Sequence, residues 1–125
     1  MELVEWDFMG QLFFKKVYQD AIRAGLKWTT IRRWDRPRVQ AGRRAFCPGL
    51  GWLRIEQVEV IGLKSLTDAD AKADGFTKLI ELREALLSLY PDHATDGKRW
   101  WRVQFDVDAI KPGKLKHPTL FREEN

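Results

Sequence analysis

The clearest pattern of apolar and polar positions lies between residues 99 and 107, where the two kinds of side chain alternate without interruption. A period of two is typical of a β-strand with one buried face. The apolar face comprises Trp101, Val103, Phe105 and Val107, and the polar face comprises Trp100, Arg102, Gln104 and Asp106. We therefore predict a strand here whose apolar face points into the core and whose Arg102 and Gln104 are exposed.

Three earlier stretches also have the composition of strands. Residues 28–33 are rich in β-branched side chains, and residues 44–47 form a short run that ends at Pro48. Residues 53–63 contain a longer alternating pattern that slips by one residue before Val58. Such a slip is the trace that a β-bulge leaves in a sequence. These patterns predict three further strands, the last of them bulged.

Three segments have apolar residues at helical spacing. The first contains Val17, Tyr18, Ala21 and Ile22 and ends at Gly25. A second begins after Thr67, which has the side chain of a helix N-cap and forms an imperfect capping box with Asp70. The third carries a stripe of leucines between Thr77, its predicted N-cap, and Pro91, which ends it. We therefore expect one longer helix early in the chain and a pair of helices in its second half.

The order of these elements predicts the fold class. Strands flank helices without regular strand–helix alternation, which favours a compact α+β domain with a small bent or closed sheet. The length of 125 residues suits a single domain. We assign this domain to residues 1–108 and interpret residues 109–125, which contain Pro112, Gly113 and Pro118, as a C-terminal tail.

The composition excludes several kinds of site. A single cysteine, Cys47, excludes a disulfide scaffold, and only two histidines, His93 and His117, argue against metal chemistry. We therefore expect no metal, no other cofactor and no obligatory protein partner. The chain lacks a run of about 18 apolar residues and does not open with a secretory signal. We expect a cytoplasmic protein without a membrane partner.

Positive charge is concentrated in one stretch. The chain has 22 basic and 18 acidic residues, but residues 23–44 contain eight basic side chains and one acid, Asp35. Trp28 and Trp34 lie within this stretch. Phosphates attract such cations and bases stack on indole rings, so the stretch suits a polyanionic or base-bearing ligand. The alternative interpretation is a solvated basic loop.

Two sequence motifs in order resemble those of the ASCH domain family. Residues 25–32, Gly-Leu-Lys-Trp-Thr-Thr-Ile-Arg, match its Gly-x-Lys helix end followed by a Thr-x-Arg strand. Residues 66–76 match its Leu-Thr-x-x-x-Ala-x-x-(Glu or Asp)-Gly motif, and a leucine-rich helix and a tryptophan-rich strand follow in the same order. The resemblance covers approximately residues 10–107.

This resemblance implies a β-barrel of the PUA-like type, with helices packed over its openings, that binds RNA or nucleotides. One branch of the family removes acyl groups from the exocyclic amine of cytidine. Its catalytic lysine, threonine and acid correspond here to Lys27, Thr30 and Asp74. Where that branch has glutamate, this chain has the shorter aspartate.

The residues at these positions have coherent chemistry. Thr30 is a poor nucleophile unless a base takes its proton. A neutral Lys27 amine is such a base, and the nearby cations Arg32 and Arg33 favour the neutral form. Asp74 either orients the lysine or passes a proton to the leaving amine. Arg32 lies on the same strand face as Thr30, where it stabilises an oxyanion or holds a phosphate.

Four residues are candidates for binding the substrate: Arg32, Arg33, Trp28 and Trp100. The arginines attract phosphate, and the indoles stack on a base. Structural alternatives stand beside the catalytic roles, since Lys27 also suits a helix C-terminus, Thr30 a strand and Asp74 a turn. The sequence therefore predicts a basic cleft that binds RNA or a modified nucleoside, with hydrolysis of the amide of N-acylated cytidine. A single-stranded RNA-binding module and a metal-independent ribonuclease are the alternatives.

Overall fold

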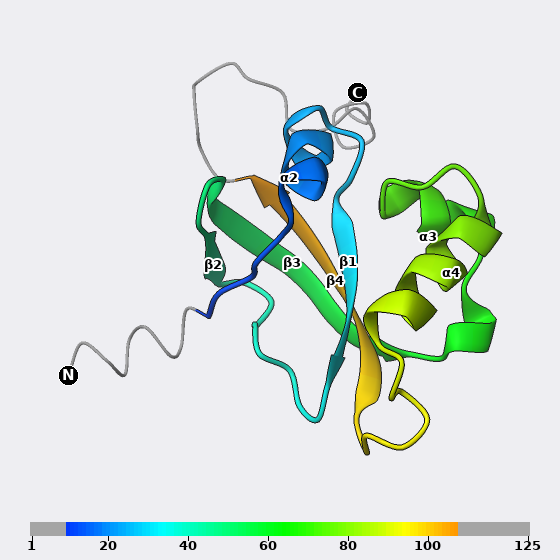
Figure 1. Cartoon of the computed structure of the whole chain (residues 1–125). Helices are drawn as coiled ribbons and strands as arrows, with labels where there is room; N and C mark the ends of the chain where they lie inside the picture. The colour runs from blue at the N-terminus through cyan, green and yellow to red at the C-terminus, as the bar shows by residue number, and fades with distance from the viewer. Residues whose placement is uncertain (1–9, 108–125) are drawn as a thin grey trace.

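The computed structural model describes residues 10–107, so the predicted tail at 109–125 lies outside the described residues. The elements in chain order are α2 (Lys16–Arg23), β1 (Thr29–Trp34), β2 (Arg44–Cys47), β3 (Gly51–Ile61), a 3-10 turn (Leu63–Ser65), α3 (Asp68–Ala73), α4 (Leu79–Leu89) and β4 (Arg99–Val107) (Figure 1). Among the helices of this part of the chain, none has the length and apolar character needed to cross a membrane.

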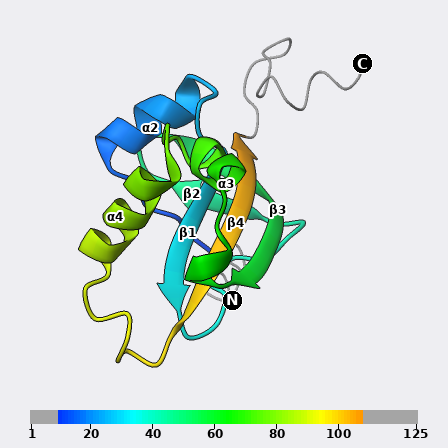
Figure 2. The ribbon, with the colours of Figure 1, turned by 90° about the vertical axis from the view of Figure 1, so that its right-hand side faces the viewer.

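The strands form one antiparallel sheet in the order β1-β4-β3-β2. Figure 1 and Figure 2 show that this sheet is strongly curled, with α3 and α4 together on one side and α2 near the end where β1 begins. The predicted α+β class is confirmed. The predicted bulge is confirmed too, because the pairing of β3 with β4 shifts between Ile55 and Gln57.

Two apolar clusters pack against the sheet. One contains Leu12, Ile22, Leu53, Val103 and Phe105 and lies beneath α2. The other joins α3 and α4 to the sheet and contains Ile31, Leu66, Ala71, Leu82, Leu86 and Trp100. The second cluster matters for function, because it holds the helix pair at a fixed position beside β1.

The predicted facing of β4 is only half right. Val103 and Phe105 are fully buried, as expected. Trp100, expected on the exposed face, is 7% exposed, and Arg102 and Gln104 are both half-buried rather than exposed. The reason is that α3 and α4 cover this face of the strand. Strand periodicity shows which residues share a face, whereas helices distant in sequence decide whether that face is covered.

The helix starts show one success and one correction. Thr67 and Asp70 form the expected capping box at the start of α3. The N-cap of α4 is Lys78 rather than Thr77. The Glu81 carboxylate accepts from the backbone N–H groups of both residues at 3.2 Å and so satisfies the helix start without a threonine cap.

Candidate functional site

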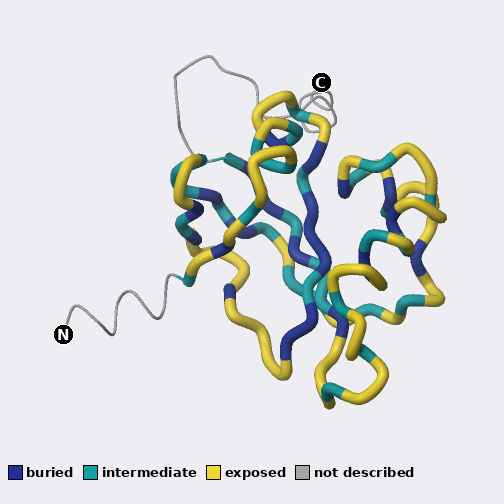
Figure 3. The backbone as a smooth tube through the Cα atoms, viewed as in Figure 1, coloured by how far each residue is buried: buried dark blue, intermediate teal, exposed yellow. Residues whose placement is uncertain are grey.

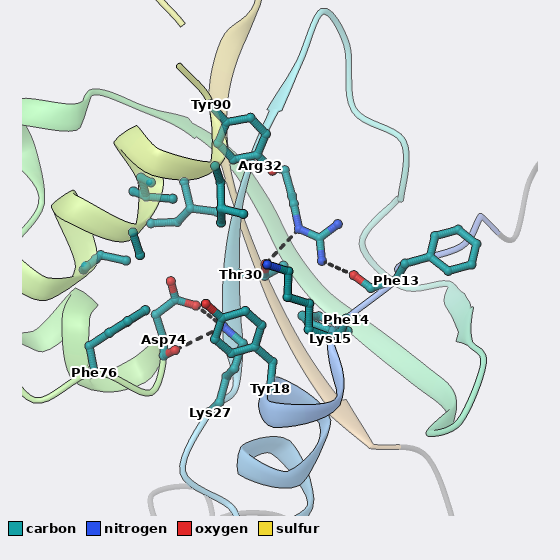
Figure 4. Close-up of a pocket in the computed structure, with 15 residues that line it drawn as sticks. Phe13, Phe14, Lys15, Tyr18, Lys27, Thr30, Arg32, Asp74, Phe76 and Tyr90 are labelled. Atoms are coloured by element: carbon teal, nitrogen blue, oxygen red, sulfur yellow. Dashed lines mark hydrogen bonds and ion pairs between the residues drawn. The ribbon is translucent and has the colours of Figure 1, made fainter. Parts of the chain in front are cut away.

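A cavity of about 160 Å3 lies where β1, the start of α2 and the α3–α4 pair meet (Figure 4). Its polar lining consists of Lys15, Lys27, Thr30, Arg32 and Asp74. The remaining lining is mainly apolar and aromatic: Phe13, Phe14, Tyr18, Ile31, Phe76, Leu82, Ala85, Leu86, Leu89 and Tyr90. The structure therefore brings Lys27, Thr30, Arg32 and Asp74 together, as the sequence predicted.

Lys27 and Asp74 form a buried ion pair in this cavity. The Lys27 Nζ donates to the Asp74 carboxylate, to the Asp74 backbone oxygen at 3.1 Å and to the Thr29 backbone oxygen at 2.8 Å (Figure 4). Both side chains are 5% exposed. Although aspartate is one methylene shorter than glutamate, Asp74 reaches the amine because it caps the end of α3 directly beside Lys27.

The residue after Asp74 makes this approach possible. Gly75 has a φ of +94°, in the region that favours glycine. A Cβ at this position would lie 3.3 Å from the Lys27 Cβ, which is closer than ordinary contact. The Asp-Gly sequence thus ends the helix and also makes room for the lysine stem.

A second contact fixes α3, and with it Asp74, on the sheet. Arg102 of β4 donates to Glu59 of the neighbouring strand and to Asp70 of α3. Asp70 also closes the capping box at the start of the helix. The carboxyl terminus of this short helix is therefore held in place from its first turn.

Burial shifts the pKa values of the ion pair toward each other. Burial lowers the pKa of Lys27, the Asp74 carboxylate opposes this shift, and the Arg32 cation adds to it. Burial likewise raises the pKa of Asp74 against the opposing effect of Lys27. As the two values approach, transfer of a proton within the pair becomes less costly, and a neutral amine becomes accessible as a base.

Thr30 and Arg32 project from the same face of β1 into the cavity. The Arg32 Nε donates to the Thr30 Oγ1 at 2.9 Å, and another guanidinium nitrogen donates to the Phe13 backbone oxygen at 2.8 Å. The guanidinium carbon lies 4.9 Å from the Phe14 ring centroid. Because the Thr30 oxygen accepts from Arg32, its own proton remains available for donation to a base.

Aromatic rings form the walls around the lysine. The Lys27 Nζ lies 5.3 Å from the Tyr18 ring centroid and 5.8 Å from that of Phe14, within the range of cation–π contacts. Sequence reasoning did not assign Tyr18 or Phe14 to the site. Tyr18 lies in the first turn of α2 and Phe14 lies just before the N-cap of this helix, Lys15.

Three of the predicted binding residues do not line the cavity: Trp28, Arg33 and Trp100. Arg33 is buried, with its guanidinium 4.6 Å from the Trp100 ring. Trp100 also packs edge-on against Tyr90. The prediction that Trp100 is exposed for stacking on a base is wrong, because its ring is enclosed by these neighbours.

Arg33 instead holds the segment between α4 and β4. It pairs with Asp96 and donates to the backbone oxygens of His93 and Lys98. This segment follows Tyr90, which lines the cavity, so Arg33 supports the site without reaching it.

The Arg33–Asp96 pair predicts acid sensitivity. The Arg33 hydrogen bond lowers the pKa of Asp96 to about 2 from its ordinary 3.8. A carboxyl group whose pKa is lowered in the folded state stabilises the fold at pH values above its pKa in the unfolded chain. This contribution is lost as pH falls from about 4 to about 2. We expect Asp96→Asn to flatten the fall in stability over this range, measured by urea unfolding. An unchanged pH dependence in the variant would contradict the assignment.

The basic stretch is divided between the interior and the surface. Arg23, Lys27 and Arg33 pair with Asp20, Asp74 and Asp96, respectively. The cations of the β1–β2 loop and of its join to β2 are exposed (Figure 3): Arg36, Arg38, Arg43 and Arg44. The net positive charge expected over residues 23–44 is therefore partly neutralised by acids from elsewhere in the chain.

Comparison of the sequence with protein-family models and with curated proteins gives no match. Three solved structures are similar in fold. Hypothetical protein PH0355 has a TM-score of 0.64 at 15% identity, over 76% of this chain and 94% of that one. The ASCH domain from Lactobacillus crispatus JV V101 has a TM-score of 0.58 at 16% identity, over 71% and 69%. Protein EF3133 from Enterococcus faecalis V583 has a TM-score of 0.60 at 15% identity, over 87% and 86%.

These likenesses establish the fold. The chain shares its fold with this ASCH domain: a curled antiparallel half-barrel sheet is accompanied by few helices. The fold class expected from the sequence is confirmed. At 15–16% identity this similarity shows the fold and does not extend to activity.

Proposed function

We propose that this protein hydrolyses the amide of N-acylated cytidine, with Thr30 as nucleophile, Lys27 as general base and Asp74 as the partner of the lysine. The observation that carries the proposal is the buried Lys27–Asp74 pair, which opens into a cavity that also contains the Thr30 hydroxyl. A nucleophile beside a base that is itself oriented by an acid is the arrangement required for acyl transfer.

The reaction has two acyl-transfer steps. The Thr30 Oγ attacks the acyl carbon while its proton passes to the Lys27 amine. The exocyclic nitrogen of cytidine then takes this proton and leaves, so that an acyl-threonine ester remains. Water, deprotonated by the same pair, cleaves the ester to a carboxylic acid and restores the hydroxyl. For the first step Lys27 exchanges its bond to the Thr29 carbonyl for one to Thr30, because catalytic hydrogen bonds commonly tighten only when substrate is bound.

Arg32 supports both steps from its position beside Thr30. Its bond to the Thr30 oxygen fixes the hydroxyl on the cavity side of β1. The positive charge so close to the reacting oxygen also stabilises the negative charge that develops on the acyl oxygen.

The direct test is turnover of N4-acetylcytidine by the purified protein in a chelating buffer. We expect release of cytidine and acetate in equal amounts. Chromatography of the nucleoside measures this release. Intact acylated cytidines together with cleaved RNA would instead identify a ribonuclease. Intact substrates together with RNA binding would identify a binding domain.

RNA binding is the second candidate, and the exposed β1–β2 loop favours it. Arg36 and Arg38 lie on this loop and contribute positive charge at the surface. We expect weak binding of single-stranded RNA that weakens further from about 50 to 200 mM salt. Replacing both arginines with alanine should reduce the slope of log K against log salt by about 1 to 1.5, since each phosphate contact to a single strand contributes about 0.7.

A matched control separates this loop from general charge. Lys64 and Lys72 are exposed on other segments, and their replacement with alanine removes the same net charge. The salt slope should stay near that of the unmodified protein in this control. Equal slopes for the two double variants would show that the loop has no special part in RNA binding.

A further inference from the structure

The charges that line the cavity are not balanced. Three cationic side chains, Lys15, Lys27 and Arg32, face a single carboxylate, Asp74. Lys27 and Asp74 neutralise each other in their buried ion pair. Within residues 10–107 no carboxylate lies within ion-pair distance of Lys15 or Arg32. The cavity therefore carries excess positive charge on these two residues.

Arg32 is the more unusual of the two because it is partly buried. Its hydrogen-bond partners are the uncharged Thr30 Oγ1 and Phe13 carbonyl, and one face lies on the Phe14 ring. A guanidinium has five N–H donors, and these two bonds leave others for a ligand. Removing a charge from water without a counter-charge is unfavourable, so an anionic ligand group at this position gains a strong, charge-assisted contact.

The size of the cavity indicates which part of a ligand meets these cations. Pockets for drug-sized ligands are commonly about 300–1,000 Å3, whereas this cavity has about 160 Å3. The cavity therefore has room for a single base-sized ring among its aromatic side chains, and the rest of a nucleotide would stay at its mouth. Lys15 and Phe13 are exposed, and Figure 4 shows the Arg32 guanidinium directed toward Phe13 and away from Phe76.

We propose that Lys15 and Arg32 bind a phosphate of a nucleotide whose base enters the cavity, so that the ligand is a phosphorylated cytidine rather than the free nucleoside. This inference rests on the proposed function for the identity of the base. The phosphate belongs either to a free nucleotide or to an RNA strand, since both present the same anionic group beside the base.

The test measures binding rather than turnover. Calorimetric titrations with cytidine, cytidine 5′-monophosphate and a cytidine pentanucleotide compare ligands that share the base. We expect at least about tenfold tighter binding of a phosphorylated ligand than of cytidine, and this advantage should shrink as salt rises. Tighter binding of the monophosphate identifies a free nucleotide as the ligand, and tighter binding of the pentanucleotide identifies RNA. Equal affinity for cytidine and both phosphorylated ligands, or no binding of the latter, would overturn the proposal.

Adjacent lysines provide a matched pair of variants. Lys15→Gln should weaken binding of the better phosphorylated ligand at least about threefold and leave that of cytidine unchanged. Lys16→Gln removes the same charge from the next residue, which pairs with Asp20 and does not line the cavity. Equal losses of affinity in the two variants would show that the effect comes from the overall charge of the protein, and would overturn the phosphate subsite.

The outcome is separable from that of the proposed hydrolysis. A preference for phosphorylated ligands in a protein that leaves acylated cytidines intact rejects the hydrolase and keeps the subsite. Hydrolysis with equal affinity for cytidine and its phosphorylated forms rejects the subsite and keeps the hydrolase.

Discussion

Thr30→Ala is expected to lower kcat/KM for N-acylated cytidine at least about a thousandfold, which corresponds to about 4 kcal/mol of transition-state stabilisation. The physical reason is that the hydroxyl is the group that attacks the acyl carbon, so its removal leaves the Lys27–Asp74 pair without the nucleophile that the proposed mechanism requires. Lys27→Ala should lower kcat/KM to a similar extent, because the loss of either residue inactivates a nucleophile and base that act as one unit. The measurement is the initial rate of cytidine release.

The neighbouring threonine is the matched control. Thr29 is as buried as Thr30, but its side chain lies on the opposite face of β1 and outside the cavity. Thr29→Val should therefore retain near-normal turnover, since its backbone oxygen, which binds Lys27, is unchanged. Thr30→Ser keeps a hydroxyl and should retain part of the rate. A Thr30→Ala protein that is folded and as active as the unmodified chain would contradict the assignment of Thr30 as the nucleophile.

The parts of the fold that local chemistry controls were predictable. β4 and β2 have the expected bounds, because alternation and a following Pro-Gly pair depend only on adjacent residues. The capping box at Thr67 is local in the same sense. The bulge in β3 was visible as a slipped period, since one additional residue changes the face of every residue after it.

The misassignments concern contacts between residues far apart in the sequence. Arg33 looked like a binding residue because it lies in a basic stretch, and its partner Asp96 is 63 residues away. Trp100 looked exposed because it alternates with apolar residues, yet the residues that enclose it come from other elements. No local pattern encodes such pairings, so charge and periodicity alone assigned these two residues to the surface.

The candidate site lies between these two cases. Lys27, Thr30 and Asp74 were identified from motifs, and the structure brings all three to one cavity. The motifs did not reveal that Lys27 is buried against Asp74, a contact across 47 residues of sequence. They also did not reveal the wall formed by Tyr18, which depends on where α2 places this ring relative to Lys27.

The buried ion pair predicts a large effect on stability. Lys27→Met is expected to lower the free energy of unfolding by about 3–5 kcal/mol, because it leaves the Asp74 carboxylate buried without its cation. Two backbone oxygens, those of Thr29 and Asp74, lose a donor in the same variant. Urea unfolding at neutral pH measures the difference.

The pH dependence of this variant shows whether charge causes the loss. Burial already raises the pKa of Asp74 above 3.8, and removing Lys27 removes the main effect that opposes this rise. A carboxyl whose folded pKa exceeds its unfolded value binds its proton more tightly in the folded state. The stability of Lys27→Met should therefore be greatest near pH 4 and fall as pH rises toward the folded pKa of Asp74.

A second substitution completes a double-mutant cycle. Asp74→Leu in the Lys27→Met background removes the unpaired charge and replaces it with an apolar side chain that branches at the same atom. The double variant should be more stable than Lys27→Met alone, with a coupling energy of about 2 kcal/mol or more between the two positions. Additive losses would mean that each side chain stabilises the fold independently, and the ion pair would then have no energetic role in holding α3 beside β1.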